Sequence, residues 1–186
     1  MVPNDVTMSP QLFTIGHGTA SEERLADLIA DARFELLVDV RSKPGSRRHP
    51  QFARAALQRW IPQRTGSAYV WDAALGGFRP VRPGSPNVAL RHPSFRAYAD
   101  YMETPEFGQA LSELIARTAA ARTVIMCSET LWWRCHRRLI SDAATLRHGA
   151  DVRHLMHDGK LEPHIVTAGV RLTEEGTLRY DVMFEQ

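Results

Sequence analysis

Short apolar runs alternate with amphipathic stretches along most of the chain, and this alternation constrains the fold more than any other feature. Five runs have the length and composition of strands, at residues 12–15, 36–40, 68–71, 123–126 and 152–155. Strands that are separated by helical segments favour a mostly parallel sheet with helices on its faces. The expected fold is therefore a three-layer, Rossmann-like α/β fold.

The segments between these runs carry helix signals. Thr19 and Glu22 have the spacing of a capping box ahead of an apolar stripe. Thr104 followed by Pro105 is typical of a helix that begins at the proline. A further helix is expected to end at Pro62, because proline lacks the N–H that a helix interior uses.

The remainder of the chain divides into a loop and a terminal hairpin. Residues 76–93 hold four prolines and three glycines with little periodicity, which indicates a long loop. Polar and apolar residues alternate on both sides of Gly176, and this pattern predicts a C-terminal β-hairpin. We interpret residues 1–186 as a single domain, with an α/β core over 8–166 and a hairpin extension over 167–186.

Composition excludes several classes of protein. Hydrophobic residues make up 44% of the 186 and charged residues 24%, as in ordinary globular domains. No secretory signal is visible, and no window approaches the roughly 18 apolar residues of a membrane span. We therefore expect a cytoplasmic protein without a membrane partner, whose two cysteines stay as thiols. A net charge of +2 argues against a large footprint on duplex nucleic acid.

Polar and small residues follow the predicted strands. They are, in chain order, His17, Asp39, Arg41, Gly76, Gly77, Cys127 and Glu129. The carboxyl ends of parallel strands share one edge of a sheet, and ligands bind there in open α/β folds. The sequence therefore predicts that four separate stretches converge on one crevice. For Asp39, orienting a neighbour, holding a metal and capping a helix are all open.

A basic loop follows the second strand. Residues 41–49 contain Arg41, Lys43, Arg47, Arg48 and His49 around a turn that a proline and a glycine impose. Guanidinium groups and exposed backbone amides suit an anion such as phosphate. A solvated basic loop without a ligand has the same composition.

Both cysteines lie in the stretch "VIMCSETLWWRCHRRLISDAA". The pattern predicts a strand, a turn, and a helix whose first turn contains Cys135, His136 and Arg137. The positive end of a helix and nearby arginines lower a thiol's pKa, so Cys127 or Cys135 is a candidate thiolate. Glu129 is better suited to act as a general base, or as a carboxylate that orients an arginine or a ligand hydroxyl. Alternatively, each cysteine is a small buried hydrophobe, the interpretation that we favour for Cys135.

Three sharper motifs fail when the residues are counted. The arginine of a thiol-phosphatase loop would stand six places after Cys127, where Trp133 lies. Haem attachment would need a cysteine three places before Cys135. Cys127, Cys135 and His136 are residue types that bind zinc, but adjacent ligands at a helix start would point in different directions. We therefore expect no metal, and the residues name no cofactor.

The ordered motifs "TIGHGT", "DVRSKPGSRRHPQF", "LGG", "YADYM", "MCSE" and "CHRRLISD" resemble the domain of unknown function 488 family. The resemblance runs over about residues 13–154, and it departs at Gly18, Lys43, Gly45 and the Trp pair. It implies an α/β fold and one common site, but no reaction. The expected catalytic residues are His17, Asp39, Cys127 and Glu129. The expected ligand-binding residues are Arg41, Ser46, Arg47, Gly76, Gly77, Tyr98, Cys135, His136 and Arg137.

These residues favour an enzyme, a hydrolase or a transferase, that acts on a phosphorylated or nucleotide-like small molecule. Arg41 and Arg47 would hold the anion, and Glu129 or His17 would move a proton. One alternative is nucleic-acid binding, in which Trp132 or its neighbour stacks on a base. The other is a non-catalytic module that binds a partner protein.

Overall fold

The chain is described by a computed structural model that covers residues 9–45 and 48–182. Its main sheet contains β1 (Gln11–Gly16), β2 (Leu36–Asp39), β3 (Ala68–Trp71), β4 (Thr123–Cys127), β5 (Asp151–Leu155) and β6 (Leu161–Pro163). The strand order is β3-β2-β4-β1-β5-β6, and the first five strands are parallel. The predicted parallel strands are thus confirmed. The antiparallel β6 was not predicted, because three residues are too few for a period to show.

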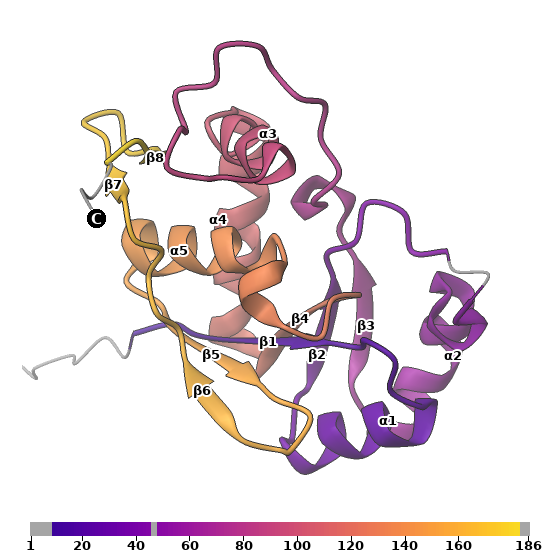
Figure 1. The fold of residues 1–186 in the computed structure, drawn as a ribbon. Coiled ribbons are helices and arrows are strands. Elements are labelled where there is room, and N and C mark those ends of the chain that lie inside the picture. The colour runs from indigo at the N-terminus through magenta and orange to yellow at the C-terminus, as the bar shows by residue number, and fades with distance from the viewer. Residues whose placement is uncertain (1–8, 46–47, 183–186) are drawn as a thin grey trace, which may run out of the picture.

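Helices cover both faces of this sheet, which confirms the three-layer α/β fold (Figure 1). One face carries α1 (Glu22–Asp31) and α2 (Arg54–Thr65), and the other carries α3 (Pro93–Met102), α4 (Pro105–Ala120) and α5 (Arg137–His148). Side chains alternate between the two cores along each strand. In β4, Val124 and Met126 join the core under α1 and α2, whereas Ile125 and Cys127 join the core under α3 to α5. The fold therefore places the Cys127 thiol against α5.

The predicted start of α1 and the predicted end of α2 are wrong. The cap of α1 is Ser21, whose hydroxyl accepts a hydrogen bond from the Arg24 N–H, so Thr19 lies outside the helix. Pro62 lies within α2, which continues to Gly66, a residue with φ of 72°. The proline is tolerated because it is exposed and within the last turn, where water can bind the carbonyl that lacks a donor.

The predicted start of the helix at Pro105 and the predicted C-terminal hairpin are confirmed. The Thr104 hydroxyl caps α4 by accepting a hydrogen bond from the Phe107 N–H. The C-terminal hairpin consists of β7 (Val170–Leu172) and β8 (Leu178–Tyr180), and Gly176 in its turn has φ of 76°. Leu178 and Tyr180 pack into the same core as α3, α4 and α5. None of the helices described is long and apolar enough to cross a bilayer.

Candidate functional site

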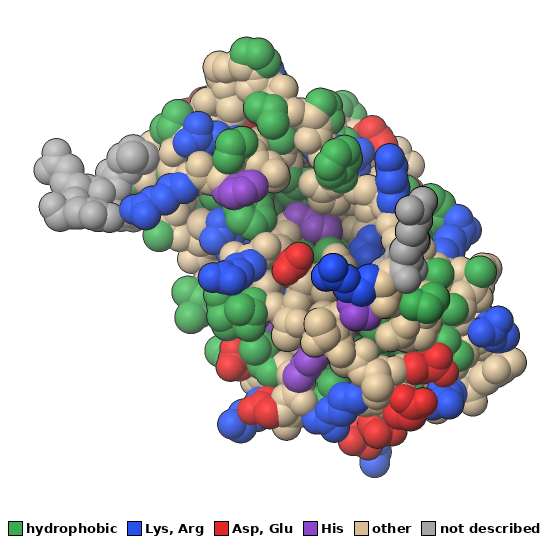
Figure 2. Space-filling model, turned by 45° about the vertical axis from the view of Figure 1, so that its right-hand side comes forward, with side chains coloured by type: hydrophobic (Ala, Val, Ile, Leu, Met, Phe, Trp, Pro, Cys, Tyr) green, Lys and Arg blue, Asp and Glu red, His purple; other side chains and the backbone are tan. Residues whose placement is uncertain are grey.

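A cleft of about 850 Å³ opens where β1, β2 and β4 end. Figure 2 shows the hollow, with histidine at its floor and lysine or arginine side chains around it. Seven of the residues that were predicted from the sequence line it: His17, Arg41, Gly77, Cys127, Glu129, Cys135 and His136. The convergence of the strand ends is therefore present in the structure, although the chemical roles of these residues stay predictions.

Four other predicted residues lie behind the wall of the cleft. Asp39 and Tyr98 are fully buried, and Arg137 is 1% exposed. Gly76 packs against Ser42. These residues shape the cleft by holding its lining in place. Two more predicted residues, Ser46 and Arg47, lie outside the described residues.

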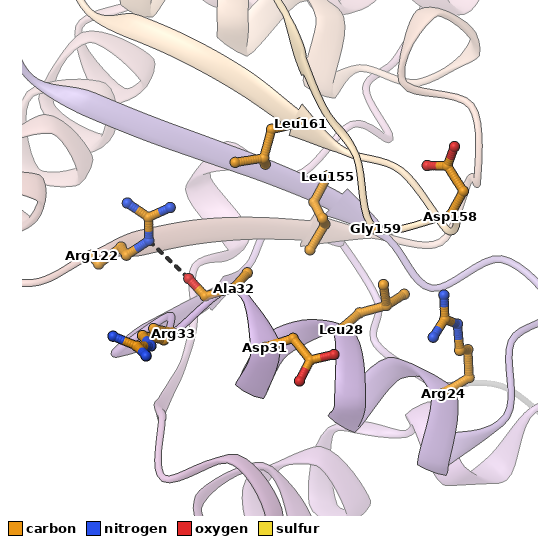
Figure 3. A pocket seen from close by; sticks show the side chains of 10 residues that line it. All are labelled: Arg24, Leu28, Asp31, Ala32, Arg33, Arg122, Leu155, Asp158, Gly159 and Leu161. Carbon is orange, nitrogen blue, oxygen red and sulfur yellow. Dashed lines mark hydrogen bonds between the residues drawn. The ribbon is translucent and has the colours of Figure 1, made fainter.

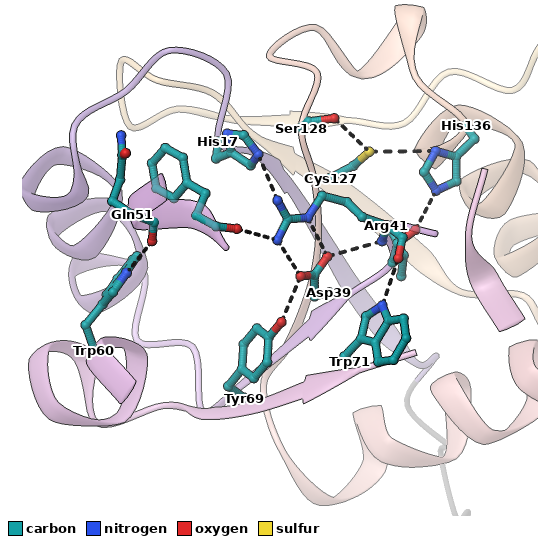
Figure 4. A network of polar contacts seen from close by, with 12 residues as sticks. His17, Asp39, Arg41, Gln51, Trp60, Tyr69, Trp71, Cys127, Ser128 and His136 are labelled. Carbon is teal, nitrogen blue, oxygen red and sulfur yellow. Dashed lines mark hydrogen bonds and ion pairs between the residues drawn. The ribbon is translucent and has the colours of Figure 1, made fainter. Parts of the chain in front are cut away.

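Asp39 and Arg41 form a buried ion pair beneath the cleft (Figure 4). The Arg41 guanidinium donates from Nε to Asp39 Oδ1 at 2.8 Å and from Nη2 to Asp39 Oδ2 at 2.6 Å. Nη2 also donates to the Phe52 carbonyl, and the Tyr69 hydroxyl donates to Asp39 Oδ2. Burial opposes the charge on Arg41, but Asp39 outweighs it and raises the arginine's pKa. The Arg41 guanidinium thus bonds to protein groups, and it holds Asp39 and the Phe52 carbonyl in position.

His17 is held neutral by this arrangement. Its Nδ1 donates to the Gly18 carbonyl, which can only accept, so the ring's proton is on Nδ1. Its Nε2 therefore accepts from Arg41 Nη1 at 3.3 Å, and the ring stacks on Phe52 at 4.3 Å between centroids. Burial, together with the charge of Arg41, lowers the pKa of His17 to about 4. The lone pair that a general base would use is already occupied.

The turn before α5 brings both cysteines to one histidine. The helix begins at Arg137, two residues later than predicted, because Cys135 is extended, with φ of −125° and ψ of 152°. The His136 Nδ1 lies 3.7 Å from the Cys127 sulfur and 3.6 Å from the Cys135 sulfur. The expectation that Cys135 and His136 point in different directions is therefore wrong.

The orientation of the His136 ring is fixed on three sides. Its Nε2 donates to the Val40 carbonyl at 3.0 Å, so the Nδ1 that faces the sulfurs carries a lone pair. The edge of Tyr98 packs against the ring, with centroids 5.1 Å apart. A Cβ at Gly77 would overlap the ring atoms, so glycine is required there. The "LGG" and "YADYM" motifs thus serve to place one imidazole.

Arg137 is a buried cation beside Cys135. Its Nε donates to the Cys135 sulfur at 3.4 Å, Nη1 donates to the Thr14 hydroxyl, and Nη2 donates to the Glu129 carbonyl. Within residues 9–45 and 48–182, it forms no ion pair with a carboxylate. A Cβ at Gly16 would overlap both the Glu129 carbonyl and this guanidinium.

The two thiols differ in acidity. For Cys127, the hydrogen bond with Cys135, reinforced by burial, raises the pKa to about 12. Burial also opposes ionisation of Cys135, but the hydrogen bond from Cys127 and the charge of Arg137 outweigh it and lower the pKa of Cys135 to about 6. The more acidic thiol is the one that we interpreted from the sequence as a buried hydrophobe.

Charged side chains at the rim complete the cleft. Lys43, Arg48 and Arg134 are exposed and line it, as does the exposed Glu129. Neither tryptophan of the pair lines it. Trp132 is 8% exposed and stacks flat on His154 at 4.1 Å, so the expected stacking of this ring on a base is not compatible with its position. Only Trp133, 41% exposed, faces solvent.

A buried polar chain that sequence reasoning missed runs behind Arg137. Thr14 Oγ1 lies 2.7 Å from His154 Nδ1, His154 Nε2 lies 3.1 Å from His164 Nδ1, and His164 Nε2 lies 2.9 Å from Asp142 Oδ1. The pairing of β1 with β5 sets Thr14 opposite His154. The register between strands creates this chain, and no motif marks it.

A second pocket, of about 610 Å³, lies between α1 and the turn that follows β5 (Figure 3). Leucines line its middle, Arg24 and Asp158 stand at one end, and Arg122 at the other donates to the Ala32 carbonyl at 2.9 Å. None of the predicted site residues lines it, whereas seven of them line the first cleft.

Comparison with known proteins identifies the family. No curated protein and no solved structure matches this chain. A family model described as domain of unknown function DUF488 matches residues 21–144, about two thirds of the chain. The matched span includes β2 and β4 together with the turn before α5, and therefore most of the cleft lining. The chain belongs to the DUF488 family.

Proposed function

We propose that this protein is an enzyme that binds a phosphorylated or nucleotide-like small molecule in the cleft at the carboxyl edge of the sheet. The observation that carries the proposal is the lining of that cleft. Three exposed cations, Lys43, Arg48 and Arg134, share it with one exposed carboxylate, Glu129, and with buried thiol and imidazole groups.

The cations account for the anionic part of the ligand. Arg41 is paired with Asp39, so among the described residues of the lining the guanidiniums of Arg48 and Arg134 are the ones available for a phosphate. A volume of about 850 Å³ lies within the usual range for sites that bind small molecules. A nucleotide-sized ligand would therefore fit with its phosphate at the rim.

Glu129 is the best-placed group for proton transfer in this cleft. It is an exposed carboxylate among cations, whereas the Nε2 lone pair of His17 is occupied by Arg41. A general base must reach the substrate proton with a free lone pair. We therefore assign the proton-accepting role to Glu129.

Calorimetric titration with a nucleoside and its mono-, di- and triphosphates, a sugar phosphate and inorganic phosphate tests binding. Saturable binding is expected for phosphorylated compounds and not for the nucleoside. The Arg48→Ala variant should weaken the Kd by roughly tenfold, since a charge-assisted hydrogen bond contributes about 1.5 kcal/mol. Arg59→Ala, which removes an exposed arginine of α2 outside the cleft, is the matched control. Equal binding of nucleoside and nucleotide would refute the proposal.

Turnover of any bound compound tests the catalytic role. The Glu129→Gln variant should keep the Kd and lose turnover, because the amide binds similarly but accepts no proton. Full turnover by this variant would remove Glu129 from the mechanism. Tighter binding of random oligonucleotides than of every small molecule, with a steep dependence on salt, would instead indicate a nucleic-acid-binding protein.

A further inference from the structure

The thiols of Cys127 and Cys135 and the imidazole of His136 form a compact group of potential metal ligands. The two sulfur atoms and Nδ1 all lie within 4.8 Å of one another. They come from the end of β4 and from the turn before α5, so the fold assembles them from two places in the chain. We propose that these three residues bind a Zn²⁺ ion.

The distances between the donor atoms fit a tetrahedral zinc ion. Zinc binds thiolate at about 2.3 Å and imidazole nitrogen at about 2.0 Å, so a tetrahedral angle separates sulfur from nitrogen by about 3.6 Å. The observed separations from His136 Nδ1 are 3.7 Å to Cys127 and 3.6 Å to Cys135. Both sulfur–nitrogen separations thus already match those around a bound ion, and the two sulfurs lie within 4.8 Å of each other.

The surroundings of His136 are those of a metal ligand. Ligating histidines donate their second N–H to a backbone carbonyl or a carboxylate, which fixes the tautomer and aims the lone pair at the metal. Here Nε2 donates to the Val40 carbonyl, and Gly77 and Tyr98 hold the ring in place. Nδ1 has one lone pair, which cannot accept from both thiols at once but can bind one ion that both sulfurs share.

The charges near the group also favour the ion. Zinc binds thiolates, so the site must stabilise two negative sulfurs. Two thiolates and a neutral imidazole give a neutral complex with Zn²⁺. The buried Arg137 donates to the Cys135 sulfur and has no carboxylate partner among the described residues, so a thiolate is the natural counter-charge for it.

The three ligands also line the cleft, which gives the site a place in catalysis. Three protein ligands with a fourth position open to solvent or substrate are typical of catalytic zinc sites, whereas structural sites have four. The fourth position would face the same space as Glu129 and the rim cations. This last step rests on the proposed function, but the binding of zinc does not.

Metal analysis and cobalt substitution test the site. Full-length protein purified under reducing conditions, stripped with a chelator and titrated with Zn²⁺ against a chromophoric competitor should bind one equivalent. Co²⁺ should produce the thiolate charge-transfer absorption and the intense visible bands of a four-coordinate complex, and added Zn²⁺ should abolish both. Wild-type protein that binds Co²⁺ without thiolate absorption, or binds no Zn²⁺ in competition, would overturn the proposal.

Variants assign the ligands. Cys127→Ser and Cys135→Ser should each remove the cobalt absorption, and Gly77→Ala should weaken Zn²⁺ binding by about 10- to 100-fold, because it displaces the imidazole without removing a ligand. Gly108→Ala is the matched control, since its Cβ would contact only Arg147. Circular dichroism confirms that each variant is folded. Unchanged spectra in both cysteine variants would contradict the assignment. These assays contain no phosphorylated ligand. A negative result for metal binding can therefore be distinguished from a negative result for the proposed function.

Discussion

His154 makes the stability of the fold depend on pH. Burial, reinforced by the electrostatic effects of its neighbours His164 and Arg137, lowers the pKa of His154 to about 2. In the unfolded chain the same imidazole has a pKa of about 6.5. Below that value the unfolded state binds a proton that the native state does not, so stability falls as the pH falls from 6.5 toward 2.

The hydrogen-bond chain explains why this histidine stays neutral. Asp142 accepts the proton of His164 Nε2, which leaves His164 Nδ1 to accept from His154 Nε2. His154 Nδ1 then accepts from the Thr14 hydroxyl, whose oxygen accepts in turn from Arg137. A proton on Nδ1 would reverse the Thr14 bond and place a second cation near the buried guanidinium.

The size of the effect follows from the two pKa values. At pH 5 the pH is about 1.5 units below the unfolded-state pKa of the histidine. The free energy of unfolding is therefore lower than at pH 8 by about 2 kcal/mol because of His154. In the variant His154→Asn, which cannot titrate, the free energy of unfolding should fall by about 2 kcal/mol less over this interval. The pH dependence from His17, whose pKa is lowered to about 4, remains in both proteins.

Urea unfolding followed by circular dichroism at pH 5, 6, 7 and 8 measures this difference, with a chelator present in every sample. His92→Asn, which replaces an exposed histidine, is the control and should parallel the wild type. The quantity compared is the slope of the free energy of unfolding against pH. A destabilisation by the Asn side chain that is the same at every pH does not change this slope. Parallel curves for wild type and His154→Asn would refute the reasoning.

Two further predictions concern the residues that support the cleft, and urea unfolding at pH 7.5 checks both. Gly16→Ala should destabilise the fold by about 2 kcal/mol or more, because its Cβ would overlap a backbone carbonyl, whereas Gly45→Ala, with no atom within 4 Å of its Cβ, should change stability by less than about 0.5 kcal/mol. Asp39→Ala should cost about 3–5 kcal/mol, since it leaves Arg41 buried and unpaired. Tyr69→Phe, which removes only a hydroxyl donor to that carboxylate, should cost about 1 kcal/mol. Equal effects within either pair would contradict these explanations.

The cleft could be predicted from the sequence because its position depends on the strand topology alone. Parallel strands end at one edge, so residues directly after them, such as His17, Arg41 and Cys127, meet whatever the details of the loops. The apolar runs and the helices between them were enough to predict parallel strands, and the order of those strands comes from the structure. The same reasoning placed Gly77 at the cleft without revealing that its role is to make room for an imidazole.

The start of α5 was mispredicted because no residue marks it. Ser, Thr, Asp or Asn usually occupies the position before a helix, but here that position is His136, whose side chain makes no capping hydrogen bond. The short helix Trp132–Arg134 and the extended Cys135 precede it. This error of two residues produced the argument against a metal, since the directions of adjacent side chains depend on the local backbone.

The "CHR" triplet has a physical explanation once its backbone is known. Cys135 is extended, His136 is in the right-handed helical region and Arg137 is the first residue of α5, so the first two side chains share one partner and the third reaches another. The thiol and the imidazole face the Cys127 thiol, while Arg137 turns under the sheet edge toward Thr14. Arg137 thereby connects the sulfur atoms at the cleft with the buried histidine chain. Because the donors of one guanidinium are divided between the two systems, we expect a change that disturbs either system to act on the other.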